Sequence, residues 1–431
     1  MKKYPWVPSA IVFLIALFLF SINLDRPPHP DELHHVLAAQ NLIETGQPLI
    51  GEGEYRRGIL HTWMVAISYE VFGESIASAR IPAVLLVALI APILFLWVRC
   101  EAGSLAAWLT AGLFISSPFT VEIAQFSRFY AIQIFSFVLG VLFYYYTLIT
   151  ATPFFRRLLM GSLAIVLVYL AFTAQVTTLF GMVGVAVWTV GLTLQRIYFN
   201  ADSSPAVKKL FTISLVVFTV AVLMMLTLTD TAQLVMERYR STQLFNADHQ
   251  NEFWFYYLRF FLFYPTLWTL VGVIALFAVI RSNRLAWLAI CIFGVSFLLM
   301  SFAGTKATRY ISFAPPFLAI LWGTGLAVIV PQLSRYVRES RVRLVETFAL
   351  PPRLGALAGN ALLIGALAVV ILSNPFWLRT LAMIGNVALP MEVPTTNWRA
   401  ASEELAPWVS EADIMITTEE LGAIYFLGRS D

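Results

Sequence analysis

Long apolar runs constrain this chain more than any other feature of its sequence. A bilayer core is about 30 Å thick, so a spanning helix needs roughly 20 apolar residues. About eleven runs approach that length, near residues 7–23, 79–98, 104–120, 129–150, 158–174, 176–194, 210–228, 267–281, 285–303, 311–330 and 355–373. Hydrophobic residues make up 59% of the 431 positions and charged residues 12%, which argues against a soluble globular chain. No run alternates apolar and polar residues, so the sequence predicts an all-α polytopic membrane protein.

Two further apolar stretches are too short or too polar to span a bilayer. Residues 59–72 read ILHTWMVAISYEVF, and residues 253–264 read FWFYYLRFFLFY. We expect both to lie at the membrane surface or to re-enter it, and the second is aromatic enough for the headgroup region. The first run follows Lys2 and Lys3 without an evident cleavage site, which favours a retained helix over a removed signal peptide.

The loops between the runs carry their charges asymmetrically. If the N-terminus is cytoplasmic, the inner segments hold more than half of the 28 basic residues: Lys2, Lys3, Arg99, Arg156, Arg157, Arg196, Lys208, Lys209, Arg281, Arg284, Arg335, Arg338, Arg341, Arg343 and Arg353. The acidic residues of the same segments are Glu101, Asp202, Glu339 and Glu346. Basic residues in short loops favour the cytoplasmic side, so we predict this orientation in the plasma (inner) membrane. The net charge of +3 hides a basic inner face and an acidic outer face, and it does not indicate a nucleic-acid partner.

Basic residues also stand in two short outer turns, against this bias. The turn at 117–128 ends in Arg128, and the turn at 304–310 carries Lys306 and Arg309. Long basic side chains at helix ends can reach the headgroups, or these residues can bind an anion. The same face carries three acidic residues, Asp31, Glu32 and Glu122. This convergence of acids and bases at one membrane surface predicts a functional site there.

The first outer loop, residues 24–78, contains a helix-like stretch from Asp31 to Gly46. Asp31 follows Pro30 in the setting of an N-terminal cap, so a cap is one reading of its role. Three of the five histidines of the chain lie nearby, at positions 29, 34 and 35. Asp31 and His35 are four residues apart and can share a helix face, either as a metal-binding pair or as an ordinary surface pair. Cys100 and Cys291 indicate no disulfide or thiolate metal site.

The composition changes after the last apolar run. We predict a transmembrane domain over 1–373, with a second outer loop at 229–266, and the start of an extracytoplasmic soluble domain over 374–431. Residues 395–409 suggest an amphipathic helix, 413–418 (DIMITT) a strand, and the last residues another helix. One strand cannot form a stable sheet, so we expect this α/β unit to be truncated here or to pair with another segment.

Several motifs together resemble a known superfamily. They are HPDELHHVLAAQNLIETGQ, GEYRRGILHTWMVAI, FGESIASARIP, SPFTVEIAQFSRFYAIQIF, GTKATRYISFAPPF, and the terminal NWRAASEEL and DIMITTEELGAIYFLGR. In this order they are similar to the GT-C glycosyltransferases, and most of all to the branch of protein O-mannosyltransferases and lipid A aminoarabinose transferases. The resemblance implies transfer of a sugar from a polyprenyl-phosphate donor, with Asp31 as the catalytic base. It also implies phosphate binding by Arg56, Arg57, Lys306, Arg309 and Tyr310. Many members have Lys-Pro-Pro-Leu after the tyrosine equivalent to Tyr55, where this chain has Arg56-Arg57-Gly58-Ile59-Leu60, so the charge is kept in a different geometry.

The residues also suit this chemistry directly. A carboxylate at the membrane boundary can take the proton of an acceptor, and arginines can stabilise a departing phosphate. We expect inversion at the sugar carbon. The predicted catalytic residues are Asp31 and Glu32; the donor-binding residues are Tyr55, Arg56, Arg57, Arg128, Tyr130, Lys306, Arg309 and Tyr310; the site-shaping residues are Glu122, His35 and Arg80. Arg80 is either a phosphate contact or, as we favour, half of a helix-end salt bridge, and a divalent ion (Mg²⁺ or Mn²⁺) stays an open alternative.

Two other classes of function are alternatives. A transporter or flippase of a lipid-linked sugar would also have many spans, but transporters place ionisable residues near the bilayer midplane. A non-catalytic envelope scaffold would leave Asp31 and the outer bases without a shared purpose. The expected partners are therefore the polyprenyl-phosphate donor, an acceptor glycan, lipid or protein, and membrane lipids.

Overall fold

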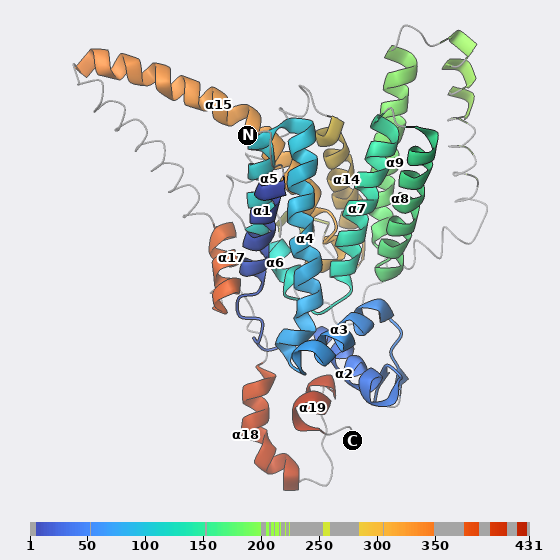
Figure 1. Ribbon diagram of the computed structural model, residues 1–431, viewed down its shortest axis with the longest axis vertical. Coiled ribbons are helices and arrows are strands. Elements are labelled where there is room, and N and C mark those ends of the chain that lie inside the picture. Colours follow the sequence, from blue (N-terminus) through green and yellow to red (C-terminus); the bar gives the residue numbers. More distant parts are fainter. Residues whose placement is uncertain are drawn as a thin grey trace.

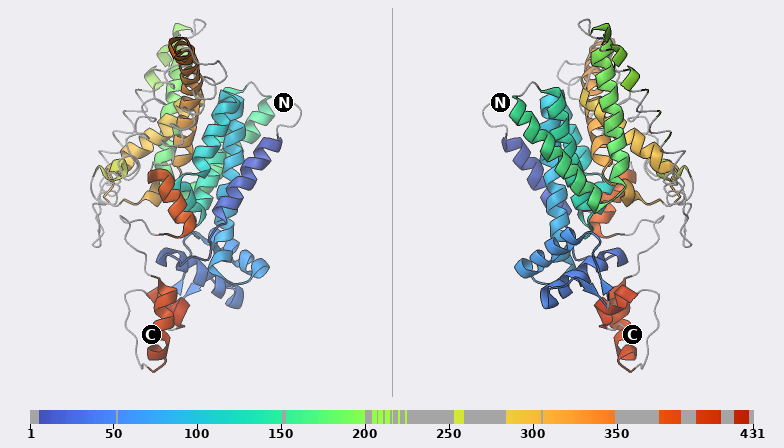
Figure 2. Two further views of the ribbon diagram at one scale, coloured as in Figure 1. Left: turned by 90° about the vertical axis from the view of Figure 1, so that its left-hand side faces the viewer. Right: turned by 90° about the vertical axis from the view of Figure 1, so that its right-hand side faces the viewer.

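The computed structural model describes most of the first half of the chain and shorter parts of the second. The described residues are 6–51, 53–150, 153–199, 204–206, 208–210, 212–214, 216, 220, 224, 253–258, 284–304, 306–348, 375–387, 397–411 and 420–428. Long helices stand side by side over most of the molecule, and shorter helices gather at one end (Figures 1 and 2).

Six helices within the described ranges are long and apolar enough to cross a membrane, or seven if the bent pair α5 (Ser104–Ile115) and α6 (Pro118–Ala124) is one span. The six are α4 (Ile76–Ala102), α7 (Tyr130–Ile149), α8 (Phe154–Ala174), α9 (Thr178–Phe199), α14 (Arg284–Ser301) and α15 (Pro315–Phe348). The predicted all-α membrane fold is confirmed. The number of about eleven spans stays a prediction, because the runs at 267–281 and 355–373 and most of 210–228 lie outside the described residues.

Helix α4 is central to the bundle and packs against α1 (Trp6–Phe20), α5 and α7. It begins where the Ser75 hydroxyl accepts a hydrogen bond from the Ser78 N–H at 3.0 Å. Its last turn ends at Gly103, whose φ of +88° suits glycine. The start of α4 therefore has a fixed position, and this start carries Arg80 to the outer end of the bundle.

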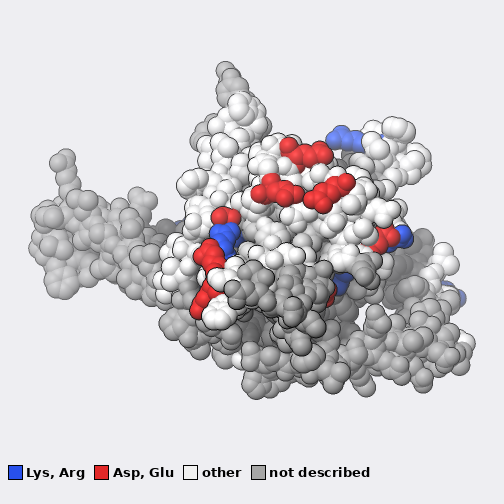
Figure 3. Space-filling model, turned by 90° about the horizontal axis from the view of Figure 1, so that it is seen from below, with Lys and Arg blue, Asp and Glu red and all other residues white. Residues whose placement is uncertain are grey.

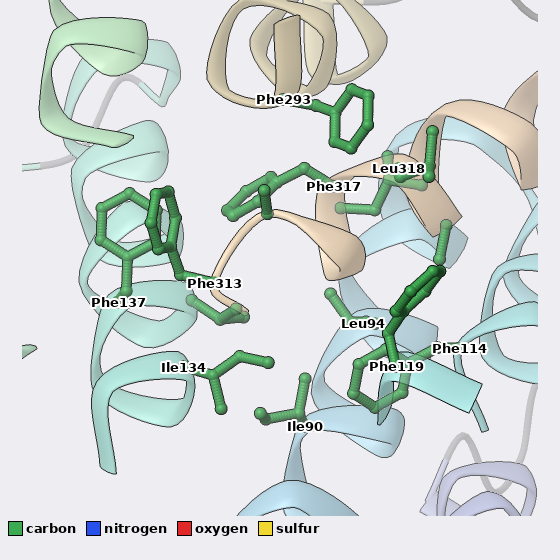
Figure 4. Close-up of a cluster of buried hydrophobic side chains, with 14 of the residues drawn as sticks. Ile90, Leu94, Phe114, Phe119, Ile134, Phe137, Phe293, Phe313, Phe317 and Leu318 are labelled. Atoms are coloured by element: carbon green, nitrogen blue, oxygen red, sulfur yellow. The ribbon is translucent and has the colours of Figure 1, made fainter. Parts of the chain in front are cut away.

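The core of the bundle is aromatic and aliphatic. Figure 4 shows side chains of several helices converging on one cluster, among them Ile90, Leu94, Phe137, Phe293 and Phe317. The rings of Phe137 and Phe317 meet edge to face, 5.9 Å apart. Between α5 and α6 the chain bends by 60° just before Pro118, because a proline disfavours helical geometry in the residue before it.

A small lobe lies below the bundle in Figure 1. It consists of α2 (Pro30–Thr45), the hairpin β1 (Leu49–Ile50) and β2 (Gly53–Glu54), and α3 (Ile59–Phe72). Helices α2 and α3 share an apolar cluster that includes Leu33, Val36 and Val65. The stretch 59–72, expected at the membrane surface or re-entering it, is therefore a helix packed on α2. Only 253–258 of the stretch 253–264 is described, and it contains α12 (Phe255–Tyr257).

Three helices follow the last predicted span. Helix α17 (Pro375–Gly385) packs beside α6, where the Thr380 hydroxyl donates to the Ser116 carbonyl oxygen at 2.7 Å. Helices α18 (Trp398–Glu411) and α19 (Glu420–Leu427) pack on each other, and α19 also packs on α2. The predicted strand at 413–418 lies outside the described residues, and the division at residue 373 stays a prediction.

The end of the molecule formed by α2, α3, α18 and α19 is acidic. Viewed from that end, red carboxylate side chains outnumber blue basic ones on the described surface (Figure 3). This distribution agrees with the acidic outer face predicted from the loops.

Candidate active site

The N-terminus of α2 is capped by His29. The His29 Nδ1 accepts a hydrogen bond from the Asp31 N–H at 3.1 Å, and Glu32 Oε2 accepts one from the His29 N–H at 2.8 Å. This reciprocal pair is a capping box, with Pro30 at the first helical position. The reading of Asp31 as the N-terminal cap is therefore wrong, since the helix starts one residue earlier. The Asp31 carboxylate is left to face other loops.

Two arginines and a histidine surround the Asp31 carboxylate. Arg309 Nη2 lies 3.0 Å from Oδ2, Arg128 Nη2 lies 3.9 Å from Oδ1, and His29 Nδ1 lies 3.9 Å from Oδ2. The Asp31 side chain keeps 26% of its surface exposed, so it is also open to an incoming molecule. Burial raises the pKa of Asp31, but Arg128 and Arg309 together lower that pKa by more. Asp31 is consequently ionised at neutral pH.

Arg128 is fixed from several directions. Its Nη1 donates to the Asp31 carbonyl oxygen at 2.6 Å and to the Tyr55 hydroxyl at 3.2 Å. The guanidinium groups of Arg57 and Arg128 each lie 5.1 Å from the centre of the buried Phe129 ring. Phe129 also packs against Gly58, and its ring contacts both guanidinium groups.

Glu32 faces the interior and forms a buried ion pair. Arg80 donates from Nε to Oε1 at 2.8 Å and from Nη2 to Oε2 at 2.6 Å, and the Ser127 N–H donates to Oε1 at 2.9 Å. Both side chains are almost fully buried, at 1% and 2% exposure. Burial raises the pKa of Glu32, but Arg80 and these hydrogen bonds lower that pKa by more. The salt bridge favoured for Arg80 is present.

This ion pair joins three segments of the outer surface. Besides Glu32, the Arg80 guanidinium donates to backbone oxygens before α2, those of Leu24 at 2.7 Å and Arg26 at 3.0 Å. The pair therefore links α2, the start of α4 and the loop after α6, and this loop carries Arg128. These contacts favour a structural role for Glu32, whose predicted catalytic role the structure does not test.

Two histidines are buried behind the site. His35 Nδ1 lies 2.9 Å from the Thr62 hydroxyl, and His61 Nε2 lies 3.3 Å from the Ser127 hydroxyl. The two imidazole rings meet edge to face at 4.9 Å. Burial lowers the pKa of His61 to about 3 and takes that of His35 well below its usual value, so both are neutral at pH 7. His35 thus packs α2 against α3.

Two other predicted site residues are Lys306 and Glu122. Lys306 is buried and donates to the Ala303 carbonyl oxygen at 2.5 Å. Glu122 Oε1 lies 3.5 Å from the Thr308 hydroxyl, one residue before Arg309, and its charge raises the pKa of Arg309 in concert with Asp31. Glu122 therefore adjoins the 3₁₀ turn η2 (Thr308–Ile311), as a site-shaping residue would.

The predicted residues Tyr130, Tyr310 and Arg56 have different surroundings. Tyr130 is buried and stacks on Phe126, 6.1 Å away, whereas the Tyr310 ring lies 5.9 Å from the Arg309 guanidinium. Arg56 is 80% exposed and pairs with Glu54 at 2.7 Å. Arg57 and not Arg56 is thus the member of that pair that faces the site.

Three residues near Asp31 were not predicted as site residues. His29 caps α2, the His34 Nδ1 lies 3.3 Å from the Asp31 carbonyl oxygen, and Ser127 donates its N–H to Glu32. The spacing of His29 and Glu32, three residues apart, is a capping-box signal that points to His29. The role of Ser127 depends on its backbone and has no sequence signal.

A divalent ion does not fit the donor set that the structure presents. In the described ranges no three side chains among His, Cys, Asp and Glu are grouped as a metal site. The oxygens of Asp31 face arginines, which would repel a cation. No step below is assigned to a metal.

The fold is similar to that of two solved structures. The chain aligns over its whole length with the crystal structure of ArnT from Cupriavidus metallidurans bound to undecaprenyl phosphate, at a TM-score of 0.65 and 16% identity, covering 86% of that chain. It aligns over 99% of its length with the oligosaccharyltransferase AglB from Archaeoglobus fulgidus, in complex with an inhibitory peptide and a dolichol-phosphate, at a TM-score of 0.59 and 13% identity, covering 60% of that chain. These likenesses show the fold.

Sequence comparison gives a shorter match. Over 109 residues the chain is 31% identical to the undecaprenyl phosphate-alpha-4-amino-4-deoxy-L-arabinose arabinosyl transferase of Shewanella sediminis (strain HAW-EB3). The match spans 24% of this chain and 20% of that relative. No protein-family model matches the chain.

Proposed function

We propose that the protein is a membrane glycosyltransferase that moves a sugar from a polyprenyl-phosphate donor to an acceptor on the outer face, with Asp31 as the general base. One observation carries this proposal: a partly exposed, ionised carboxylate lies among arginines at the mouth of the bundle. The fold supports it, because the neighbours ArnT and AglB were solved with undecaprenyl phosphate and a dolichol-phosphate.

Asp31 suits the role of base because its carboxylate is ionised and can accept a proton. The acceptor hydroxyl or amine would approach from the aqueous side and hydrogen-bond to the exposed part of the carboxylate. As its proton passes to Asp31, the acceptor attacks the sugar carbon from the side opposite the phosphate. That geometry inverts the configuration at this carbon.

The leaving phosphate needs cations where its charge develops. Arg309 and Arg128 lie on the two oxygens of Asp31, and Arg57 shares the Phe129 ring with Arg128. Arginine suits this purpose because its planar donors match two phosphate oxygens at once. Phosphate and base would therefore share one small region, as a direct displacement requires.

The test is sugar transfer by the purified protein, with Asp31→Asn compared to wild type. A panel of polyprenyl-phosphate sugars serves as donors, and donor binding is measured separately. The matched control is Asp25→Asn, which removes an exposed carboxylate of the same loop that pairs with Arg399 at 3.2 Å. We expect Asp31→Asn to lower transfer by at least 100-fold, on the order of a lost general base, while donor binding and the control stay near wild type.

Two other results would contradict the proposal. Equal transfer by wild type and Asp31→Asn would remove Asp31 as the base. No transfer from any donor, together with movement of the donor lipid across liposomes, would favour the flippase.

A further inference from the structure

The two arginines that pair with Asp31 differ in their exposure and in their contacts. Arg128 is about 5% exposed and is fixed by the Asp31 carbonyl oxygen, the Tyr55 hydroxyl and the Phe129 ring. Arg309 is 30% exposed and reaches Asp31 through Nη2. It stands on the four-residue turn η2, and 3₁₀ turns have weaker hydrogen bonds than α-helices. Arg309 is therefore the cation that can move.

Arg309 also has donors to spare. A guanidinium offers five N–H donors in a planar fork, and among the described residues the Nε atoms of Arg309 and Arg128 are both buried without a hydrogen-bond partner. Of the two side chains, Arg309 is the more exposed and so the more accessible to a second acceptor. A buried donor without a partner is destabilising, because it has lost its hydrogen bonds to water. A second acceptor near Arg309, such as a phosphate oxygen, would offset that loss.

The position of Arg309 also creates a conflict in the empty site. A carboxylate held by two cations is a poor proton acceptor, because both cations stabilise its ionised form. Of the two arginines that pair with Asp31, Arg309 is the more exposed, at 30% against 5% for Arg128, and so the better placed to meet a phosphate. One side chain cannot serve both anions fully at once.

We propose that Arg309 pairs with two anions in turn. It forms an ion pair with Asp31 while the site is empty, and it exchanges this partner for the donor phosphate when the donor binds. This inference rests on the proposed function and adds an order of binding to it. The donor binds first and releases Asp31, and only then can Asp31 take the acceptor proton. Arg128 stays in place and keeps Asp31 oriented through its hydrogen bond to the Asp31 carbonyl oxygen.

The chemical step then balances without a further reagent. The bond from the acceptor O or N to hydrogen breaks, and its proton goes to Asp31 Oδ2, the oxygen that Arg309 has left. The acceptor forms a bond to the sugar carbon, and the bond from that carbon to the phosphate oxygen breaks. Its electron pair stays on the phosphate, where Arg309 now neutralises the additional charge.

The other charged or titratable groups described around Asp31 do not compete with Arg309 in this exchange. His29 and His34 of α2 have lowered pKa values because of burial, so both are neutral near pH 7. Glu122 on α6 lies 3.5 Å from the Thr308 hydroxyl, and its charge, like that of Asp31, favours the charged form of Arg309. Within the described ranges, the other groups that interact with Asp31 or Arg309 include Arg128, Tyr55, Tyr130 and Tyr310.

The experiment is an infrared titration of the Asp31 carboxyl, whose band is assigned by its loss in Asp31→Asn. The titration is performed with and without undecaprenyl phosphate, in wild type, Arg309→Gln and Arg309→Lys. The control is Arg399→Gln, which removes an exposed arginine from another carboxylate pair. Undecaprenyl phosphate binding is measured in the same samples.

In wild type, undecaprenyl phosphate should raise the midpoint of the Asp31 titration by about one pH unit or more, the size of a lost ion pair. In Arg309→Gln the midpoint should be raised before the lipid is added and should move much less upon binding. Arg309→Lys should restore part of the wild-type shift, and Arg399→Gln should match wild type.

Equal shifts in wild type and Arg309→Gln would overturn the exchange, because the phosphate charge alone would then account for them. That result would leave the glycosyltransferase standing if wild type still transfers sugar. Failure of undecaprenyl phosphate to bind, with no transfer from any donor, would overturn the proposed function and the exchange together.

Discussion

Both carboxylate oxygens of Glu32 accept hydrogen bonds from the Arg80 guanidinium, at 2.8 and 2.6 Å, although 48 residues separate the two side chains. Asp31 immediately precedes Glu32 in the chain. The ion pair gives these adjacent acids opposite surroundings, one at the surface and one in the interior. Adjacent residues on a helix point about 100° apart, and this separates the two roles.

Breaking this pair should destabilise the protein strongly. Arg80→Met leaves the Glu32 charge buried without its partner, at a cost of about 3–5 kcal/mol. The double variant Glu32→Leu with Arg80→Met should recover much of that loss, because it removes both charges. Thermal unfolding followed by tryptophan fluorescence measures the change. If Glu32→Gln instead kept its stability and lost turnover, Glu32 would be catalytic.

Two glycines with the same backbone conformation should differ when changed to alanine. Gly58 has a φ of +64°, and a Cβ there would lie 2.6 Å from Phe129 Cδ1; Gly46 has a φ of +77° and nothing within 4 Å. Gly46→Ala should cost about 1–2 kcal/mol from the left-handed conformation alone. Gly58→Ala should cost about 1–3 kcal/mol more because of overpacking, and it should weaken donor binding because Phe129 supports Arg57 and Arg128. Equal effects on unfolding and on donor affinity would show that Phe129 gives way freely.

The buried histidines should make stability depend on pH. The pKa of His61 is about 3 when folded and about 6.5 when unfolded, so the unfolded chain binds more protons between these values. Stability is complete above pH 6.5 and falls as the pH drops, with a limiting slope of about 1.4 kcal/mol per pH unit for this histidine. His61→Asn should remove that part of the slope. Denaturant unfolding between pH 5 and 7, above the range of the carboxylates, provides the measurement, and an unchanged slope would refute this assignment.

Adjacent arginines should differ in importance. Arg57 stacks on Phe129 beside Arg128, whereas Arg56 is 80% exposed and pairs with Glu54. Arg57→Ala should weaken donor affinity by roughly 10-fold, the size of one charge-assisted contact to a phosphate. Arg56→Ala should change it less than 2-fold, since exposed ion pairs contribute little. Titration of both variants with a polyprenyl-phosphate donor decides which arginine faces the phosphate.

The membrane fold was predictable because long apolar runs have one stable solution in a bilayer. The sequence also placed Asp31 and Arg309, 278 positions apart, on one surface, through the order of spans and the charges in their loops. Neither inference depends on side-chain geometry.

The separate roles of those residues, at the surface or in the interior, were not predictable. Whether Glu32 faces water or Arg80 depends on the rotation of α2, which His29 sets through its cap. The same is true of the loop after α6, where Ser127 acts through its backbone N–H. Sequence spacing shows which residues reach a surface, and packing decides which of them turn inward.

The packing of α19 on α2 has a consequence for biogenesis. Leu421 and Tyr425 of α19 pack on the apolar cluster of α2 and α3. A chain grows and inserts from its N-terminus, so the helix that bears Asp31 is synthesised early and receives this support late. A nascent chain that has inserted its spans but has not yet delivered α18 and α19 holds an unfinished first loop. The first loop therefore gains its packing against α19 only after residues 420–427 have been synthesised.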